Sequence, residues 1–369
     1  MGHKSREMEN LVNRRFLLEK FSNKNVFVTG HTGFKGSWLL CILKQLGAKV
    51  KGYALAPETD ENLYCIVNDE GTLCESILRD IRDGEGLKEE ILSFQPDFIF
   101  HLAAQPLVRY SFKEPLETFE VNTMGTANLL DALRSLQKKC SVVVVTTDKV
   151  YLNIESHMAY TESDRLGGFD PYSTSKAMAE LVTSSYRDSF FNIKGVDEHQ
   201  KSICTARAGN VIGGGDWSKD RIIPDIVAAL AAGNAVQVRN PDAIRPWQHV
   251  LEPLFGYLLL VAHLSDSPKE FSGAWNFGPM PGDQLTVAEL VNKAIFAWGS
   301  GEMTIIKDLT AVHEAGLLKL DIGKAIKCLS WKPLLDADTA VQWTIDWYKQ
   351  DEKGRKEFTY QQIDQYMRL

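Results

Sequence analysis

The sequence predicts an α/β protein built on a doubly wound parallel sheet, and three observations support this fold class. Short, largely apolar runs without polar alternation, at residues 26–28 and 141–145, are typical of strands buried on both faces of a parallel sheet. Apolar residues at helical spacing follow the first run over residues 38–46. A glycine-rich turn joins that strand to that helix, as in βαβ units. The alternation continues, with further strands expected at residues 76–78 and 97–101.

The turn after the first strand has glycines at every third position, a GxxGxxG spacing. Gly30 lets the chain turn tightly, Gly33 lets backbone approach a pyrophosphate, and Gly36 lets helix and strand pack closely. The start of the next helix offers free N–H groups and a positive dipole end to phosphates. Because strand and helix are both present, we expect a dinucleotide site in a Rossmann-type domain rather than only a packed βαβ corner.

Composition excludes several classes of protein. The chain has 369 residues, and its net charge of −7 argues against a nucleic-acid partner, which usually needs a basic face. The six cysteines form no CxxC pattern and the histidines form no HExxH, so we expect no metal and reduced thiols in the cytoplasm. The longest apolar run, near residues 253–264, is too short to span a membrane.

Polar residues of catalytic type follow the strongest strand. Thr147, Asp148 and Lys149 come directly after residues 141–145, at the strand end where ligands bind in doubly wound sheets. An ordinary exit from a strand would explain Thr146 and Thr147 alone, but explains the added Asp and Lys less well. The two threonines are adjacent, so the sequence leaves open which of them takes part.

Tyr172 and Lys176 lie four positions apart, on one face of an expected helix. A lysine ammonium beside a phenol lowers the pKa of the tyrosine toward neutrality, so that the tyrosine can act as a base. The YxxxK pattern is common by chance. After a glycine-rich turn and a strand that ends in threonine, it is a strong indication of catalysis.

Several binding roles stay open from the residues alone. The second strand ends in Gly-Tyr-Ala-Leu at residues 52–55, with neither an acid for a ribose nor an arginine for a 2′-phosphate, so NAD and NADP are not distinguished. Asp80 either contacts an adenine amine or lies in a surface turn. Arg221 and Arg245 are candidates to hold a diphosphate, although each alone could be a surface charge.

Seven motifs, taken together, resemble the extended short-chain dehydrogenase/reductase family, and within it most closely the CDP-D-glucose 4,6-dehydratases. The resemblance covers about residues 21–350. The subgroup rests on GHTGFKG, TDK and RPWQHV, because the related dTDP-glucose and GDP-mannose dehydratases have a Glu in place of Lys149. In chain order the motifs are TGHTGFKG, HLAAQ, TTDKVY, YSTSK, ARAGNVIGGGDW, RPWQHV and WNFGP.

The resemblance implies an NAD-dependent internal redox cycle on CDP-D-glucose. C4 is oxidised to a ketone, water is eliminated across C5 and C6, and the hydride returns to C6, giving CDP-4-keto-6-deoxy-D-glucose. The enzyme would then be a carbon–oxygen lyase of deoxysugar biosynthesis, such as that of lipopolysaccharide O-antigen. A 4-epimerase, a 4,6-dehydratase for another nucleotide sugar and a non-catalytic NAD-binding protein remain alternatives; Asp148 and Lys149 favour a dehydratase over an epimerase.

The resemblance also implies a role for each catalytic residue. Tyr172 would take the C4 hydroxyl proton, assisted by Lys176, which would also bond the nicotinamide ribose. Thr147 would hydrogen-bond the C4 oxygen. Asp148, kept protonated by a raised pKa, would donate to the departing C6 hydroxyl. Lys149 would either take the C5 proton as a neutral amine or stay charged and stabilise the enolate.

The same resemblance implies two sets of binding residues. The nucleotide sugar would contact Asn210, Arg221 and Arg245 through its diphosphate, with Arg109 facing the sugar or diphosphate. Tyr172 and Lys176 would contact the cofactor, and the other residues lining its site would be Gly30, Gly33, Phe34, Gly36, Asp80, Ile81, Leu102, Ala103 and Ala104.

The expected organisation has two domains. Residues 21–209, with a later contribution from about 240–270, would bind NAD. Residues 210–239 and 271–369 would form a smaller C-terminal domain that binds the nucleotide sugar, and residues 1–20 a peripheral extension. We expect one helix over about 115–136 and a marginally structured tail from Asp351. The helices near 115–136 and 172–190 resemble those that build family dimers, which implies a homodimer or homotetramer.

Overall fold

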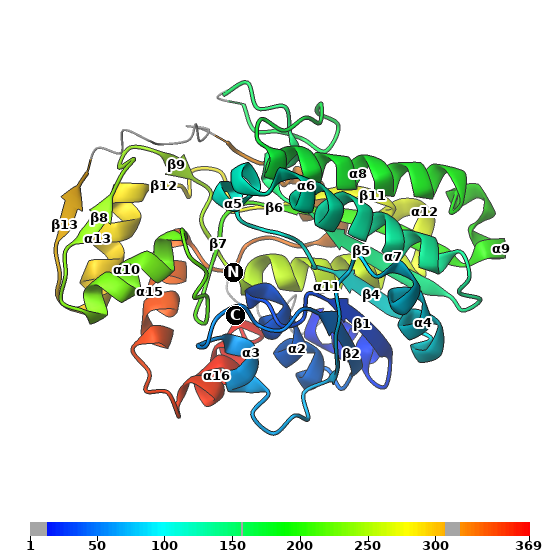
Figure 1. Ribbon diagram of the computed structural model, residues 1–369, viewed down its shortest axis with the longest axis horizontal. Helices are drawn as coiled ribbons and strands as arrows, with labels where there is room; N and C mark the ends of the chain where they lie inside the picture. Colours follow the sequence, from blue (N-terminus) through cyan, green and yellow to red (C-terminus); the bar gives the residue numbers. More distant parts are fainter. Residues whose placement is uncertain (1–12, 156–157, 307–317) are drawn as a thin grey trace, which may run out of the picture.

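A computed structural model describes residues 13–155, 158–306 and 318–369. Its centre is a seven-stranded parallel sheet, which confirms the predicted doubly wound α/β fold (Figure 1). In order across the sheet, the strands are β11 (Gly273–Phe277), β6 (Lys201–Ala208), β5 (Cys140–Val145), β4 (Phe98–His101), β1 (Asn25–Thr29), β2 (Lys49–Ala54) and β3 (Glu75–Leu78).

Both faces of this sheet are covered by helices. On one face lie α2 (Phe34–Gln45) and α11 (Leu251–Asp266), and on the other α4 (Gly84–Phe94), α7 (Gly125–Leu133) and α8 (Pro171–Ser189). Successive strand residues therefore enter different cores: Val26 and Val28 pack in one and Phe27 in the other. Because both sets must be apolar, the strands have the continuous apolar runs that the sequence shows.

The helical run expected over 115–136 is present but not regular. It consists of α6 (Pro115–Phe119), a π-helical turn at Glu120–Met124 and α7. Within the π turn, Asn122 accepts a hydrogen bond from the Gln105 N–H at 2.8 Å and donates to the Ser175 hydroxyl at 2.8 Å. The widened turn thus ties the loop after β4 to α8, at the edge of the sheet where ligands bind.

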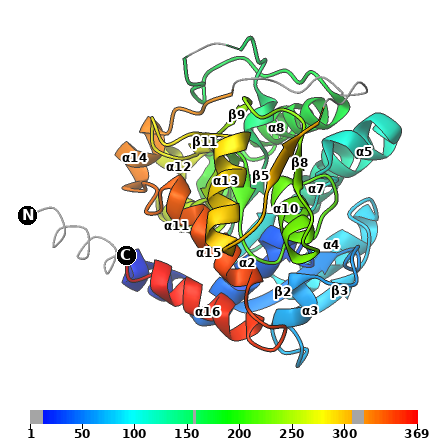
Figure 2. The same ribbon diagram turned by 90° about the vertical axis from the view of Figure 1, so that its left-hand side faces the viewer.

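A smaller group of elements lies beside the carboxyl edge of the sheet (Figures 1 and 2). It includes α10 (Ile222–Ala231), β8 (Val236–Val238), α13 (Val287–Trp298), β13 (Met303–Ile305) and α15 (Ala337–Tyr348). The remaining elements are α3 (Leu63–Val67), α5 (Val108–Lys113), the 3-10 turns Asp148–Val150 and Ile193–Gly195, α9 (Val196–His199), β7 (Val211–Ile212), β9 (Ile244–Arg245), β10 (Gln248–His249), α12 (Pro268–Phe271), β12 (Leu285–Thr286), α14 (Gly323–Leu329) and α16 (Arg355–Tyr366).

One boundary of the expected domains needs correction. Strand β11 pairs in parallel with β6 and completes the large sheet, although the sequence analysis assigned residues from 271 onward to the smaller domain. The preceding helix, α11, packs against β5 and β6, in keeping with the later contribution expected from about 240–270. The chain therefore returns to the smaller group of elements only after β11.

The two ends of the chain also differ from expectation. Residues 13–21 are helical, with Leu17 and Phe21 buried, so this part is not peripheral; residues 1–12 lie outside the described range. Beyond Asp351, α16 is a formed helix with Thr359 and Ile363 buried, and the Trp347 indole N–H donates to the Thr359 hydroxyl at 2.9 Å. Among the described helices, none is both long and apolar enough to cross a bilayer.

Candidate active site

A cavity of about 600 Å³ opens at the carboxyl edge of the sheet, between the sheet and the smaller group of elements. Such an edge is where doubly wound sheets bind ligands. The structure brings all the predicted site residues into the lining of this one cavity. They are Gly30, Gly33, Phe34, Gly36, Asp80, Ile81, Leu102, Ala103, Ala104, Arg109, Thr147, Asp148, Lys149, Tyr172, Lys176, Asn210, Arg221 and Arg245.

The glycine turn forms a tight cradle at one end of the cavity. Gly30 has a φ of +74°, and a Cβ there would lie 2.6 Å from the Ala103 nitrogen. A Cβ on Gly36 would lie 2.2 Å from the Gly30 carbonyl oxygen. Gly33 caps α2 without a side-chain hydrogen bond, which leaves the first N–H groups of the helix open to the cavity. This arrangement fits a bound pyrophosphate.

The end of β2 is built differently from the usual pattern. The His31 ring lies where a Cβ on Gly52 would be, 2.3 Å from that position, and one ring nitrogen is 2.7 Å from the Ser76 hydroxyl. Burial lowers the pKa of His31 to about 4. The loop that follows places Glu58 at the cavity wall, an acid that sequence reasoning missed because the search stopped at residue 55. Its carboxylate could accept from a ribose hydroxyl.

Asp80 lies at the cavity wall, where its carboxylate already accepts hydrogen bonds from Arg82. The Arg82 guanidinium donates to one carboxylate oxygen at 2.6 Å, and the Arg82 backbone N–H donates to the other at 2.8 Å. These bonds hold the pKa of Asp80 below its usual value. A carboxylate has lone pairs to spare, so Asp80 can still accept from an adenine amine.

The two adjacent threonines after β5 have different partners. The Thr146 hydroxyl donates to Glu180 at 2.6 Å, in the interior behind the cavity. The Thr147 hydroxyl donates to Asp148 at 2.9 Å and also hydrogen-bonds with the Tyr172 phenol. This geometry favours Thr147 over Thr146 as the threonine that faces a substrate.

Tyr172 and Lys176 lie on one face of α8, and both side chains are buried. Burial raises the pKa of Tyr172 to about 12, opposed by the charge of Arg221 and the hydrogen bond with Thr147. Burial lowers the pKa of Lys176 to about 8, and its ammonium donates to the Val145 carbonyl at 3.3 Å. The expected lowering of the tyrosine pKa toward neutrality is therefore absent, because desolvation of the phenolate outweighs the nearby positive charge.

Asp148 is almost fully buried, which raises the pKa of its carboxyl, while Lys149 opposes this shift. That direction agrees with the expected role of a protonated donor. Gly209, after β6, makes room for the carboxyl: a Cβ there would lie 3.2 Å from an Asp148 oxygen. Lys149 is half-buried at the cavity wall.

Lys35 is a further functional candidate that sequence reasoning missed. Its ammonium lines the cavity and lies 6.0 Å from the centre of the Tyr257 ring. Burial, then the charges of Arg221 and Lys176, lower its pKa to about 7, while Asp148 opposes them. An amine with this pKa can hold or release a proton near neutral pH. Its position inside the glycine motif was the available signal, but there only the glycines were assigned roles.

Three arginines reach the cavity from separate elements. Arg109, on α5, lies 3.5 Å from Asp220, and Arg221, just before α10, lies 3.5 Å from Asp216. The charge of Arg245, on β9, is close enough to lower the pKa of Asp148. Together they make the middle of the cavity positive, which suits a diphosphate on an otherwise acidic protein.

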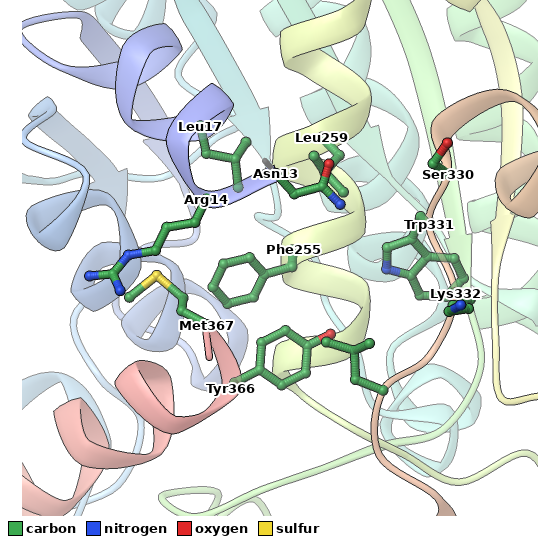
Figure 3. Close-up of a pocket in the computed structure, with 11 residues that line it drawn as sticks. Asn13, Arg14, Leu17, Phe255, Leu259, Ser330, Trp331, Lys332, Tyr366 and Met367 are labelled. Carbon is green, nitrogen blue, oxygen red and sulfur yellow. The ribbon is translucent and has the colours of Figure 1, made fainter. Parts of the chain in front are cut away.

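A second, much smaller cavity lies apart from these residues (Figure 3). It has a volume of about 50 Å³ and is enclosed by the first described helix, α11, α16 and residues 330–334. Phe255 and Tyr366 stack at its edge with ring centres 4.8 Å apart. No predicted site residue lines it, and its lining is a packing boundary between the two chain ends and α11.

The chain is similar in sequence to nucleotide-sugar dehydratases and in fold to solved dehydratase and epimerase structures. A family model described as GDP-mannose 4,6 dehydratase matches residues 27–344. The chain is 46% identical over 331 residues to the CDP-glucose 4,6-dehydratase of Salmonella typhimurium, covering 89% of this chain and 91% of that protein. A dTDP-glucose 4,6-dehydratase from Streptomyces venezuelae with NAD and DAU bound has a TM-score of 0.76 at 24% identity, covering 90% and 99%. A UDP-glucose 4-epimerase from Thermotoga maritima has a TM-score of 0.75 at 20% identity, covering 88% and 98%.

Proposed function

The chain belongs to the extended short-chain dehydrogenase/reductase family, and we propose that it is an NAD-dependent CDP-D-glucose 4,6-dehydratase. The observation that carries this proposal is the placement of Thr147, Asp148 and Lys149 beside Tyr172 and Lys176 in one cavity. Thr147, Asp148 and Lys149 would supply the groups that elimination of water needs. Tyr172 and Lys176 would supply the base, and the residue that assists it, for oxidation of the alcohol. The identity of 46% to a CDP-glucose 4,6-dehydratase supports the choice of nucleotide.

NAD would be held by the residues at the glycine-turn end of the cavity. The turn from Gly30 to Gly36 would hold the pyrophosphate, Asp80 and Ile81 the adenine, and Lys176 the nicotinamide ribose. When bound, NAD would supply the acceptor for the C4 hydride and the donor that returns it to C6, and its positive charge would favour the Tyr172 phenolate.

Tyr172 and Thr147 would act on the C4 hydroxyl. The Tyr172 phenolate takes the hydroxyl proton, and Thr147 hydrogen-bonds the same oxygen. Lys176 would assist Tyr172 from one helical turn away on α8, and with its pKa lowered to about 8 it can gain or lose a proton near neutral pH. The raised pKa of Tyr172 makes its phenolate a strong base once formed.

Asp148 and Lys149 would act on the elimination. The ketone at C4 acidifies the C5 proton, and Asp148 protonates the departing C6 hydroxyl, since hydroxide is a poor leaving group. Burial keeps the Asp148 carboxyl protonated more readily than an exposed one. Lys149 lies next in the chain, where it either takes the C5 proton or stabilises the enolate by its charge.

We also propose that the protein forms a homodimer, or a homotetramer of two such dimers, and works in the cytoplasm. Apolar side chains are exposed on α6, the π turn and α8, at Leu116, Met124 and Leu181. A second copy would cover them. Light scattering should report a dimer or tetramer, and Leu181→Glu should shift it toward monomer. The six free cysteines support a reducing compartment.

Mass spectrometry of the purified protein with NAD and nucleotide sugars tests the reaction. CDP-glucose should lose one water with no net NADH, while dTDP-glucose, UDP-glucose and GDP-mannose react much more slowly. Isomerisation without loss of mass, detected by NMR, would favour an epimerase. Binding of NAD without conversion of any sugar would show a non-catalytic binding protein, and loss of water from another sugar would correct the nucleotide.

A further inference from the structure

The far end of the cavity, away from the glycine turn, is formed by the smaller group of elements. Ile222 of α10, Val238 of β8 and Val287 of α13 line it with apolar surface, and these elements lie together in Figure 1. Arg221 and Arg245 line the same cavity, and their charges are close enough to lower the pKa of Tyr172 and of Asp148, respectively. A diphosphate held by these arginines would direct its nucleoside into this apolar end, where a flat base can pack. This step rests on the proposed function, which supplies a nucleotide sugar as the ligand.

Three carboxylates line this half of the cavity, and two of them have partners. Asp216 lies 3.5 Å from Arg221 and accepts from the Ser218 N–H at 3.0 Å. Asp220 lies 3.5 Å from Arg109. For Asp225, the described part of the chain provides no hydrogen bond or ion pair to the carboxylate. Asp225 is thus the acid at this end whose acceptor capacity is left for a ligand.

Asp225 is also at the right place along the ligand path. It lies in the first turn of α10, where its backbone N–H donates to the Arg221 carbonyl at 3.1 Å. It therefore lies one helical turn beyond Arg221, and it lines the same cavity as the apolar residue Ile222 of this helix. Partial burial, then the neighbouring Asp220, raise the pKa of Asp225, while Arg239 and Arg109 oppose them. These are the charged groups that face it from other segments of the cavity wall.

The chemistry of a carboxylate distinguishes pyrimidine bases. Cytosine carries an amine at position 4, which donates hydrogen bonds, whereas uracil and thymine carry a carbonyl, which only accepts. An ionised carboxylate only accepts, so it pairs with the cytosine amine and is repelled by the uracil or thymine oxygen. We propose that Asp225 is the residue that selects cytidine over uridine and thymidine nucleotides, by accepting from the cytosine amine.

Isothermal titration calorimetry of the full chain with CDP and UDP tests this without turnover. The wild-type protein should bind CDP at least about tenfold more tightly than UDP. In Asp225→Asn the amide can both donate and accept a hydrogen bond. CDP should therefore bind more weakly and UDP more tightly, and the ratio of their affinities should fall below about threefold. Asp220→Asn is the matched control. It removes a neighbouring acid from the same cavity and should keep the ratio near the wild-type value.

The outcomes separate the inference from the proposed function. The inference would be overturned if Asp225→Asn weakened the binding of CDP and UDP equally, or left the ratio of their affinities unchanged. It would also be overturned if the wild-type protein did not prefer CDP, or if Asp220→Asn, rather than Asp225→Asn, lost that preference. A protein that prefers CDP through Asp225 but does not dehydrate CDP-glucose would support the inference and refute the reaction. A melting curve for each variant checks that the exposed substitutions leave the fold intact.

Discussion

Glu180 and Arg207 form a bidentate ion pair in the core, with the guanidinium Nε and Nη2 each 2.9 Å from a different carboxylate oxygen. The Thr146 and Thr205 hydroxyls donate to the same carboxylate at 2.6 and 2.7 Å. Glu180 lies one helical turn after Lys176 on α8, so this network fixes the catalytic helix against the ends of β5 and β6.

Replacing Glu180 with Gln should therefore destabilise the fold. The variant leaves the buried Arg207 charge without its partner, which costs about 3–5 kcal/mol of unfolding free energy. Urea denaturation followed by circular dichroism measures this loss. Asp188→Asn changes an exposed acid on the same helix and should cost less than about 0.5 kcal/mol. Similar losses in both variants would show that the pair contributes little.

Tyr172→Phe should abolish oxidation and elimination together. Without the phenol no base takes the C4 proton, and without the ketone the C5 proton is not acidic, so turnover should fall by about 10²–10⁴-fold. Because the pKa of Tyr172 lies well above neutral pH, the phenolate population grows as pH rises, so C4 oxidation by the wild-type protein, read as reduced cofactor in a single turnover, should become faster from neutral to alkaline pH. Tyr186→Phe, on the same helix but outside the cavity lining, should keep wild-type turnover; product is quantified by mass spectrometry.

Asp148→Asn should separate the two half-reactions. Asn cannot protonate the departing C6 hydroxyl, but Tyr172 and Thr147 remain to oxidise C4. Loss of water should fall by about 10²-fold or more, while formation of reduced cofactor, read by absorbance in a single turnover, should fall far less. Equal loss of both signals would contradict the assigned role. Asp216→Asn, another acid of the cavity wall, should affect both signals alike through binding.

The glycine turn allows a matched pair of substitutions. A Cβ on Gly36 would lie 2.2 Å from the Gly30 carbonyl oxygen, a backbone atom that cannot yield, so Gly36→Ala should lower the melting temperature and abolish NAD binding. A Cβ on Gly33 meets only the same oxygen at 3.5 Å, an ordinary contact. Gly33→Ala should keep the melting temperature but weaken the binding of NAD about tenfold or more, because it adds a methyl group to the turn that would hold the pyrophosphate. Calorimetric binding of NAD and thermal melts distinguish the two.

Local patterns were enough to predict the sheet and the members of the site. The sequences of β1 and β5 are apolar because helices cover both faces of the sheet. The glycine turn and the candidate catalytic residues come directly after these strands in the sequence, so they could be predicted from it. The sequence could not show that Thr146 and Thr147 hydrogen-bond to different partners. Glu180, the partner of Thr146, comes close to it only because α8 packs on the sheet. The pKa of Tyr172 was predicted in the wrong direction, since the pattern shows the nearby lysine but not the depth of burial.

The C-terminal helix, α16, could not be predicted from the sequence for a different reason. Two of the buried residues of α16, Thr359 and Gln362, are polar, so the segment has no apolar stripe from which a packed helix could be predicted. Both side chains find distant partners: the Thr359 hydroxyl accepts from the Trp347 indole N–H, and the Gln362 amide nitrogen donates to the Trp343 carbonyl at 2.8 Å. Lys35 was missed for a related reason, because its neighbours Lys176 and Arg221 meet it only in the folded cavity.

Glu252, at the start of α11, connects that helix to two other segments and should make stability depend on pH. Its fully buried carboxylate accepts from the Leu335 N–H at 2.7 Å and the Tyr366 phenol at 2.7 Å, and burial raises its pKa from 4.5 to about 7. Between these two values the folded state binds more protons than the unfolded state. This group therefore makes the unfolding free energy fall as pH rises from about 4.5 to 7, by on the order of a few kcal/mol.

Glu252→Gln removes the titration while keeping an oxygen to accept from the backbone. Urea denaturation of the variant at several pH values should give a flatter dependence than wild type between pH 4.5 and 7, with the variant relatively more stable above pH 7. Glu357→Gln, an exposed acid on α16, is the control and should follow the wild-type curve. Parallel curves for Glu252→Gln and wild type would mean that the buried carboxyl keeps an ordinary pKa. In that case the contact between α11 and Tyr366 would have to be stabilised by hydrogen bonds to a fully charged group.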